Sequence, residues 1–175
     1  DVYKRQADDP VHWQTWTSDT LSLAKKLNRP ILISSGYFSC HWCHVMQAEN
    51  YKNSVTAEII NRHFIAVKID RELNTELDNT MVDFSKRTTG QGGWPQHVIL
   101  TPNGAPFAAF IYMPNSTLNN YLNRLSKLWQ QDSSTIIKLA RQSNPESHIE
   151  SIKPTTTPLT KSAFSQLLFK VVNQE

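Results

Sequence analysis

Two cysteines separated by two residues, Cys40 and Cys43, follow closely on a short apolar run, and this succession constrains the fold more than any other feature of the chain. The run Ile31-Leu32-Ile33 is rich in β-branched residues and follows a proline, which is typical of a buried strand of the parallel-sheet type. From Cys43 to Arg62 the sequence is compatible with a helix. The spacing therefore predicts a strand, a dithiol and a helix in direct succession.

The flanking segments extend this unit into an α/β domain. Asn and Lys cluster at residues 50–53, so we expect the helix after Cys43 to be interrupted there and its second half to be capped by Ser54. Further elements are predicted at residues 17–27 (helix), 64–69 (strand), 75–86 (helix), 97–100 and 106–112 (a hairpin through Asn103-Gly104), 116–129 and 132–142 (helices). This order predicts a thioredoxin-like fold, a central mixed sheet flanked by helices.

The position of the dithiol at a helix start indicates redox chemistry. The Cys40 sulfur is expected to lie on the unpaired N–H groups and the positive end of the helix dipole, which favours its thiolate form. We predict that His41 and Trp42 tune this thiolate and that the pKa of Cys40 is depressed. Cys40 is then the nucleophile, and Cys43, expected to be the more buried cysteine, resolves the mixed disulfide. The redox-active disulfide Cys40-Cys43 is the only cofactor-like group that we expect.

Three other uses of the cysteines are compatible with the motif. With His44 it spells C-x-x-C-H, the attachment sequence of c-type haem, although a strand and a βαβ unit around it are unlike the helical surroundings of such a haem. Zinc binding through the cysteines and His41 or His44 lacks a second ligand pair. Two inert, buried cysteines are the remaining alternative.

A second candidate feature, Gly93-Trp94-Pro95, precedes a predicted strand. Aromatic-proline bonds tolerate the cis form, but an ordinary trans turn is compatible with the same residues. In a thioredoxin-like fold Pro95 is expected to be cis and to face the cysteines. The backbone of Trp94 is then free to pair with an extended substrate.

Composition excludes several functions. The 18 basic and 15 acidic residues are scattered, so the net charge of +3 does not indicate nucleic-acid binding. No stretch has the 18 apolar residues of a membrane helix, and no targeting signal is evident, which favours a cytoplasmic location.

The chain divides into four segments by composition. Residues 1–8 form a polar run that we expect to be disordered or spurious, and residues 9–142 form the thioredoxin-like domain. Residues 143–158 are rich in proline and polar residues, as linkers are. Residues 159–175 return to a helical apolar pattern and are expected to begin a truncated helical domain.

These motifs resemble the N-terminal domain of the spermatogenesis-associated protein 20 family. The resemblance runs from about Asp9 to Pro114, through Trp13, Trp16, Arg29-Pro30-Ile31, Gly36-Tyr37, Cys40 to Met46, Val67 to Glu72, and Thr89 to Pro102. It implies a thioredoxin relative followed, in the full-length protein, by a helical barrel domain.

Two functions remain open. One is a thiol-disulfide oxidoreductase that acts on protein or small-molecule thiols and disulfides. The other is a non-catalytic thioredoxin-fold module that binds a partner or supports the helical barrel.

Overall fold

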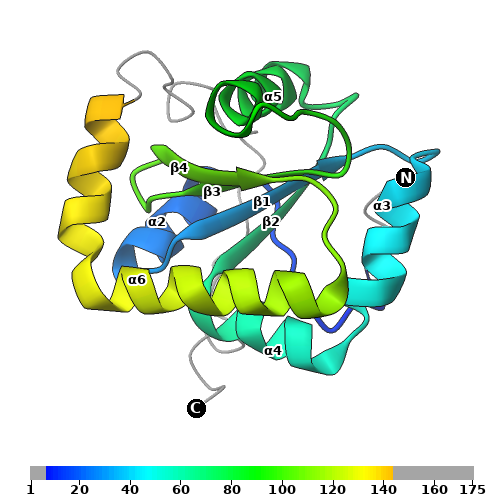
Figure 1. Ribbon diagram of the computed structural model, residues 1–175, viewed down its shortest axis with the longest axis horizontal. Helices are drawn as coiled ribbons and strands as arrows, with labels where there is room; N and C mark the ends of the chain where they lie inside the picture. Colours follow the sequence, from blue (N-terminus) through cyan, green and yellow to red (C-terminus); the bar gives the residue numbers. More distant parts are fainter. Residues whose placement is uncertain (1–6, 144–175) are drawn as a thin grey trace.

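The computed structural model describes residues 7–143, which form a four-stranded mixed sheet between two layers of helices (Figure 1). The strand order is β2-β1-β3-β4. Strand β1 (Ile31–Gly36) runs parallel to β2 (Ile65–Asp70) and antiparallel to β3 (Gln96–Leu100), which pairs antiparallel with β4 (Pro106–Phe110). The outer edge of β2 is covered by the chain around Gln14, which bridges to Val67. The α/β thioredoxin-like arrangement predicted from the element order is confirmed.

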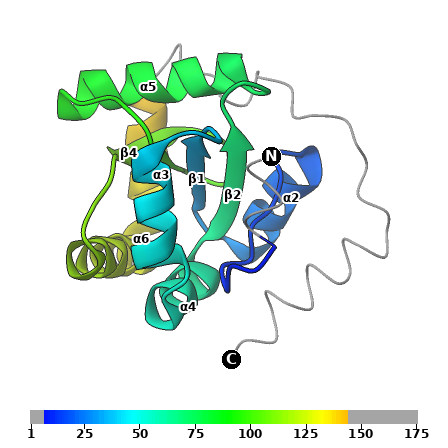
Figure 2. The same cartoon turned by 90° about the vertical axis from the view of Figure 1, so that its right-hand side faces the viewer.

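Helices cover both faces of this sheet, as the rotated view in Figure 2 shows. One face carries α2 (Ser18–Leu27) and α5 (Thr75–Thr89). The other carries α3 (His41–Met46), the π-helix η1 (Gln47–Tyr51), α4 (Ser54–His63) and α6 (Asn115–Ser143). Every residue of β1 and β2 is buried, including the polar residues Ser34, Ser35, Lys68 and Asp70.

Alternation along β1 divides the core into two clusters. Ile31 and Ile33 pack with residues of α2 and α5, whereas Leu32 packs with residues of α3, α4 and α6. Fully burying one aliphatic side chain of this size contributes roughly 1.5–3 kcal/mol, so both clusters matter for stability. The alternation also aims Ser34 and Ser35 at opposite faces of the sheet.

The interruption predicted near residue 50 is present, but its cap is one residue earlier than expected. The helix that starts after Cys40 widens into η1 and ends at Tyr51. Asn53, not Ser54, caps α4, because its side-chain oxygen accepts hydrogen bonds from the backbone N–H groups of Val55 (3.0 Å) and Thr56 (3.1 Å).

The last two predicted helices form one kinked helix. Within α6, Asp132 leaves the helical conformation (φ −156°, ψ 69°). Its carboxylate accepts hydrogen bonds from the Thr135 N–H (3.0 Å) and the Ser134 hydroxyl (2.8 Å), so it caps the second half of the helix. This second half turns along the β4 side of the sheet.

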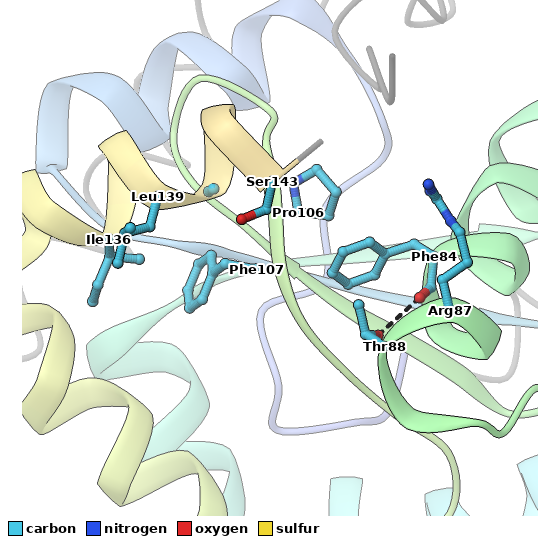
Figure 3. A pocket seen from close by; sticks show the side chains of 9 residues that line it. Phe84, Arg87, Thr88, Pro106, Phe107, Ile136, Leu139 and Ser143 are labelled. Carbon is cyan, nitrogen blue, oxygen red and sulfur yellow. Dashed lines mark hydrogen bonds between the residues drawn. The ribbon is translucent and has the colours of Figure 1, made fainter. Parts of the chain in front are cut away.

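A groove of about 570 Å³ lies between α5, β4 and the second half of α6 (Figure 3). The close view shows Phe84 and Phe107 on either side of it, with Leu139 beyond Phe107 and Arg87 beyond Phe84. Because Pro106 pairs with Leu100, the groove lies at the end of the strands remote from Gly36. It is therefore separate from the cysteines described below.

The segment predictions at the two termini lie almost wholly outside the described residues. This applies to residues 1–6, to the linker beyond Ser143 and to residues 159–175. Among the described residues, no helix combines the length and apolar character needed to cross a membrane.

Candidate functional site

The two cysteines form a disulfide at the point where β1 passes into α3. Cys40 is the N-cap residue of α3, and its Sγ accepts a hydrogen bond from the Cys43 backbone N–H at 3.2 Å. Its own N–H donates to the Tyr37 carbonyl at 3.2 Å, which fixes the short loop between strand and helix. The expected contact of the Cys40 sulfur with an N-terminal N–H group of the helix is thus present. The same N–H group is available to stabilise a thiolate in the reduced protein.

Gly36 forms the floor of the disulfide. A Cβ atom at this position would lie 2.8 Å from Cys43 Sγ, closer than the sulfur permits, so only glycine allows this approach. In the β1–β3 pairing Ser35 lies opposite Gln96, and the same register places Pro95 opposite Gly36. The Trp94–Pro95 peptide bond is cis. Pro95 therefore sits across from the residue on which the Cys43 sulfur rests.

The relative burial of the two cysteines is the reverse of the prediction. Cys40 is only 3% exposed, whereas Cys43 is partly exposed. The cause is the position of each residue. Cys40 lies beneath the Tyr37 loop, with its carbonyl bonded to the His44 N–H, while Cys43 lies within the first turn of α3.

Aromatic side chains border the disulfide on the α3 side. Trp42 is 52% exposed, and its ring lies 5.6 Å from that of His41 and 4.9 Å from that of Tyr112. The Tyr112 hydroxyl donates to the Glu49 carboxylate at 2.6 Å, and this bond raises the pKa of Tyr112. The tuning role of His41 and Trp42 stays a prediction, while their placement beside the cysteines forms an exposed aromatic rim.

Trp94 is held on the opposite side by residues that the sequence analysis did not single out. Its Nε1–H donates to the Asp78 carboxylate at 2.9 Å. The Arg71 guanidinium lies over its ring, 3.8 Å from the centroid, and the Tyr37 ring is 6.0 Å away. Asp78 could have been identified as a candidate from the sequence, because it is a charged residue within the apolar face of a predicted helix.

The geometry also bears on the haem and zinc alternatives. The side chain that would ligate a haem, His44, is engaged through Nε2 with the Phe38 carbonyl oxygen at 2.9 Å. Both cysteine sulfurs are bonded to each other. The surroundings are an α/β sandwich, unlike the helical surroundings of a c-type haem.

A second polar cluster lies buried beneath η1. Lys68 Nζ donates to Ser34 Oγ at 2.9 Å, and the Tyr51 hydroxyl bonds both Ser34 Oγ (3.2 Å) and His97 Nε2. Burial lowers the pKa of Lys68 to about 8, with the Asp9 carboxylate opposing the shift. Burial, and secondarily the charge of Lys68, lowers the pKa of His97 to about 3. We refer to Lys68, Ser34, Tyr51 and His97 as the lysine cluster.

The mixed sheet and the CxxC disulfide at a helix start define a thioredoxin-like protein. A thioredoxin from Thermus thermophilus superposes with a TM-score of 0.52, at 17% sequence identity, over 66% of this chain and 87% of that thioredoxin. At this identity the likeness shows the fold alone.

The family follows from the sequence comparisons. Residues 2–146 match the Thioredox_DsbH model, described as a protein of unknown function, DUF255, and the chain belongs to this family. It is 34% identical to human spermatogenesis-associated protein 20 over 140 residues, 77% of this chain. It is 41% identical to the uncharacterized protein B0495.5 of Caenorhabditis elegans over 110 residues, 63% of this chain. The resemblance predicted from the sequence is confirmed. The matches span only 18% and 15% of the lengths of these two relatives.

Proposed function

We propose that this chain is a thiol-disulfide oxidoreductase that works through Cys40 and Cys43. The observation that carries the proposal is the disulfide between Cys40 and Cys43 at the start of α3, with Gly36 beneath it and the cis Pro95 opposite. An N–H group already directed at Cys40 Sγ supports this cysteine as the nucleophile, because a thiolate there keeps a hydrogen-bond donor.

In the reducing direction the reaction has two thiol-disulfide exchange steps. The Cys40 thiolate attacks one sulfur of a substrate disulfide, forms a mixed disulfide, and releases the other substrate sulfur as a thiolate that takes a proton. Deprotonated Cys43 then attacks Cys40 Sγ, which forms the intramolecular disulfide and releases the second substrate thiol. Two electrons pass from the dithiol to the substrate, and an external dithiol must reduce Cys40-Cys43 again.

The partial exposure of Cys43 is compatible with these roles. The attacking cysteine is set by thiolate stabilisation and by access: the N–H contact belongs to Cys40, and this residue, 3% exposed in the disulfide form, has to become accessible to the substrate in the reduced protein. Cys43 needs only to reach Cys40 Sγ. In the reverse, oxidising direction the Cys40-Cys43 disulfide accepts two electrons from a substrate dithiol through the same mixed disulfide.

The proposed substrate platform is the backbone around Gly93, Trp94 and Pro95. Its position opposite Gly36 brings an extended polypeptide, paired with the backbone of Trp94, toward the cysteines. The partners in this proposal are protein or small-molecule thiols and disulfides in the cytoplasm, and a helical barrel domain that follows in the full-length protein.

Turnover of a disulfide substrate tests the proposal. The 175-residue chain is assayed for reduction of insulin disulfides with dithiothreitol as the external dithiol, and its reduction potential is measured against a glutathione series. We expect turnover above the rate of dithiothreitol alone. We also expect a Cys43→Ser variant to accumulate a mixed disulfide on Cys40, detectable by mass spectrometry.

The Cys40→Ser variant is the essential control. It retains the fold-defining residues but lacks the nucleophile, so its rate should equal the background. Turnover that is absent in the wild type, or equal in wild type and Cys40→Ser, overturns the enzymatic proposal. Such a result leaves the non-catalytic binding module as the function to pursue.

A further inference from the structure

Asp78 on α5 is a buried carboxylate that joins three separate segments of the chain. It is only 1% exposed. Its Oδ1 accepts hydrogen bonds from the Ser35 hydroxyl (2.5 Å) and from the Trp94 indole N–H (2.9 Å), and Oδ2 lies 3.8 Å from Arg71 Nε. A buried charge is tolerated when several donors surround it, and here they come from β1, from the loop before β3 and from the turn after β2.

Each partner of Asp78 is adjacent to the candidate site. Ser35 precedes Gly36, on which Cys43 Sγ rests. Arg71 donates its backbone N–H to the Gly36 carbonyl at 2.9 Å, and its guanidinium stacks over Trp94. Trp94 precedes the cis Pro95. The carboxylate thus connects the floor of the disulfide with the proposed substrate platform.

Trp94 would be poorly fixed without these contacts. It follows two glycines, which contribute no side chains of their own: a Cβ atom at Gly93 would meet no neighbour within 4 Å, whereas one at Gly92 would lie 3.0–3.3 Å from the side chains of Lys86 and Val82. Its ring has polar contact through Nε1 with Asp78 and stacking contact with Arg71 and Tyr37. An indole fixed at both its N–H and its face also fixes the backbone of its own residue.

We propose that Asp78 is a positioning residue for substrate binding. Through the indole of Trp94 and the guanidinium of Arg71, it holds the Trp94 backbone in the orientation that pairs with an extended polypeptide substrate. This inference rests on the proposed function and goes beyond it, because it assigns the specificity for polypeptide over small disulfides to a residue that touches neither the cysteines nor the substrate.

A comparison of two substrates separates positioning from general damage. One is a peptide dimer joined by a single cystine, which has a backbone to pair with Trp94, and the other is bis(2-hydroxyethyl) disulfide, which has none. Asp78→Asn retains the shape but loses the charge. Because the Trp94 indole N–H and the Arg71 guanidinium then face a neutral amide in place of a carboxylate, we expect the ratio of kcat/KM for the peptide to that for the small disulfide to fall roughly tenfold. The fall should come mainly from KM for the peptide.

Asp83→Asn is the matched control, because it makes the same change at an exposed position of the same helix. It should leave the substrate ratio at the wild-type value. A second variant, Trp94→Phe, removes the Nε1–H donor and retains a ring over Arg71. This substitution alone should lower the substrate ratio. When Asp78→Asn is combined with Trp94→Phe, the further fall in the ratio should be smaller than the fall that Asp78→Asn causes in the wild type, because the shared contact is already gone.

The outcomes distinguish the two proposals. A wild type that turns over neither substrate contradicts the enzymatic function itself. A wild type that turns over both, with Asp78→Asn lowering both rates equally, contradicts only the positioning role. If Asp78→Asn does not fold, Trp94→Phe decides: an unchanged ratio in that variant overturns the inference.

Discussion

Ser34 and Ser35 are neighbours on β1, yet they take part in two different kinds of buried polar cluster on the two faces of the sheet. Ser34 faces η1 and belongs to the lysine cluster, centred on a buried cation. Ser35 faces α5 and donates to Asp78, a buried anion. Both serines are fully buried, so the two sites differ in the groups that surround each hydroxyl and not in exposure.

The two clusters differ in what they connect. On the η1 face, Lys68, Ser34 and His97 lie in one row across β2, β1 and β3, and Tyr51 covers them from above. Lys68 Nζ also lies 5.2 Å from the Trp13 ring centroid and 5.0 Å from that of Tyr51. On the α5 face, Asp78 reaches Arg71 and Trp94 at the rim of the disulfide site.

This difference separates stability from site geometry. The lysine cluster is enclosed by aromatic rings and a π-helix, so changes there should appear in the free energy of unfolding. The Asp78 cluster ends at partly exposed side chains beside the cysteines, so changes there should appear in substrate preference. A lysine-cluster variant that shifts substrate preference, or an Asp78 variant that loses stability without a change in substrate preference, would contradict this separation.

The largest expected effect is on the η1 face. Tyr51 is fully buried, its ring lies 4.8 Å from that of Trp13, and its hydroxyl bonds two members of the cluster. Replacing a buried aromatic side chain with alanine typically costs about 3–5 kcal/mol, and we expect Tyr51→Ala to lower the free energy of unfolding by that amount in urea titrations.

Tyr51→Phe is the control for this variant, since it removes the hydroxyl and keeps the ring. It should cost only about 1 kcal/mol. A loss below about 1 kcal/mol for Tyr51→Ala itself would show that the cluster does not support the fold, contrary to the cavity cost expected for such a residue.

Sequence reasoning predicted the features that depend on near neighbours. The strand before Cys40, the helix over residues 17–27 and the contact between the Cys40 sulfur and a helix N–H all follow from residues within one or two turns. The fold followed from the order of the predicted helices and strands, and the family from motifs such as Cys40 to Met46 and Thr89 to Pro102.

The features that were missed depend on contacts between distant segments. Trp94 meets Asp78, 16 residues before it in the sequence, and Lys68 meets Ser34 across 34 residues, through the pairing of two strands. A lysine within an apolar strand indicates a buried cation. The residue that accepts its hydrogen bond can be identified only when the pairing register of the two strands is known. The burial of Cys40 likewise depends on the loop at Tyr37, whose path no periodicity defines.

The next effect is a pH dependence of stability that belongs to Lys68. Its pKa is lowered to about 8 in the folded protein, from an ordinary value of 10.5. Between pH 8 and 10 the unfolded chain still holds the proton that the folded protein has lost, so raising the pH favours folding. We expect the free energy of unfolding to rise by about 2 kcal/mol over this interval.

Lys68→Met isolates this effect, because it keeps a long side chain against Trp13 and Tyr51 and cannot titrate. Its stability should show no such rise between pH 8 and 10. The measurement stops at pH 10, since burial raises the pKa of Tyr51 and ionisation of that tyrosine in the unfolded chain then opposes the trend. Equal slopes for wild type and variant would assign the pH dependence to other groups.

The smallest and sharpest comparison uses the two serines themselves. Ser34→Ala removes the acceptor of the Lys68 ammonium and should lower the free energy of unfolding by about 1–2 kcal/mol, because a buried donor loses its partner. Ser35→Ala leaves Asp78 with Trp94 and Arg71, so its cost in stability should be about 1 kcal/mol or less. The effect on substrate preference should be the reverse: Ser35→Ala lowers the preference for the peptide over the small disulfide, and Ser34→Ala leaves it unchanged. If Ser34→Ala shifts the preference as much as Ser35→Ala does, the two faces of the sheet act on the site together, and the division between stability and site geometry is wrong.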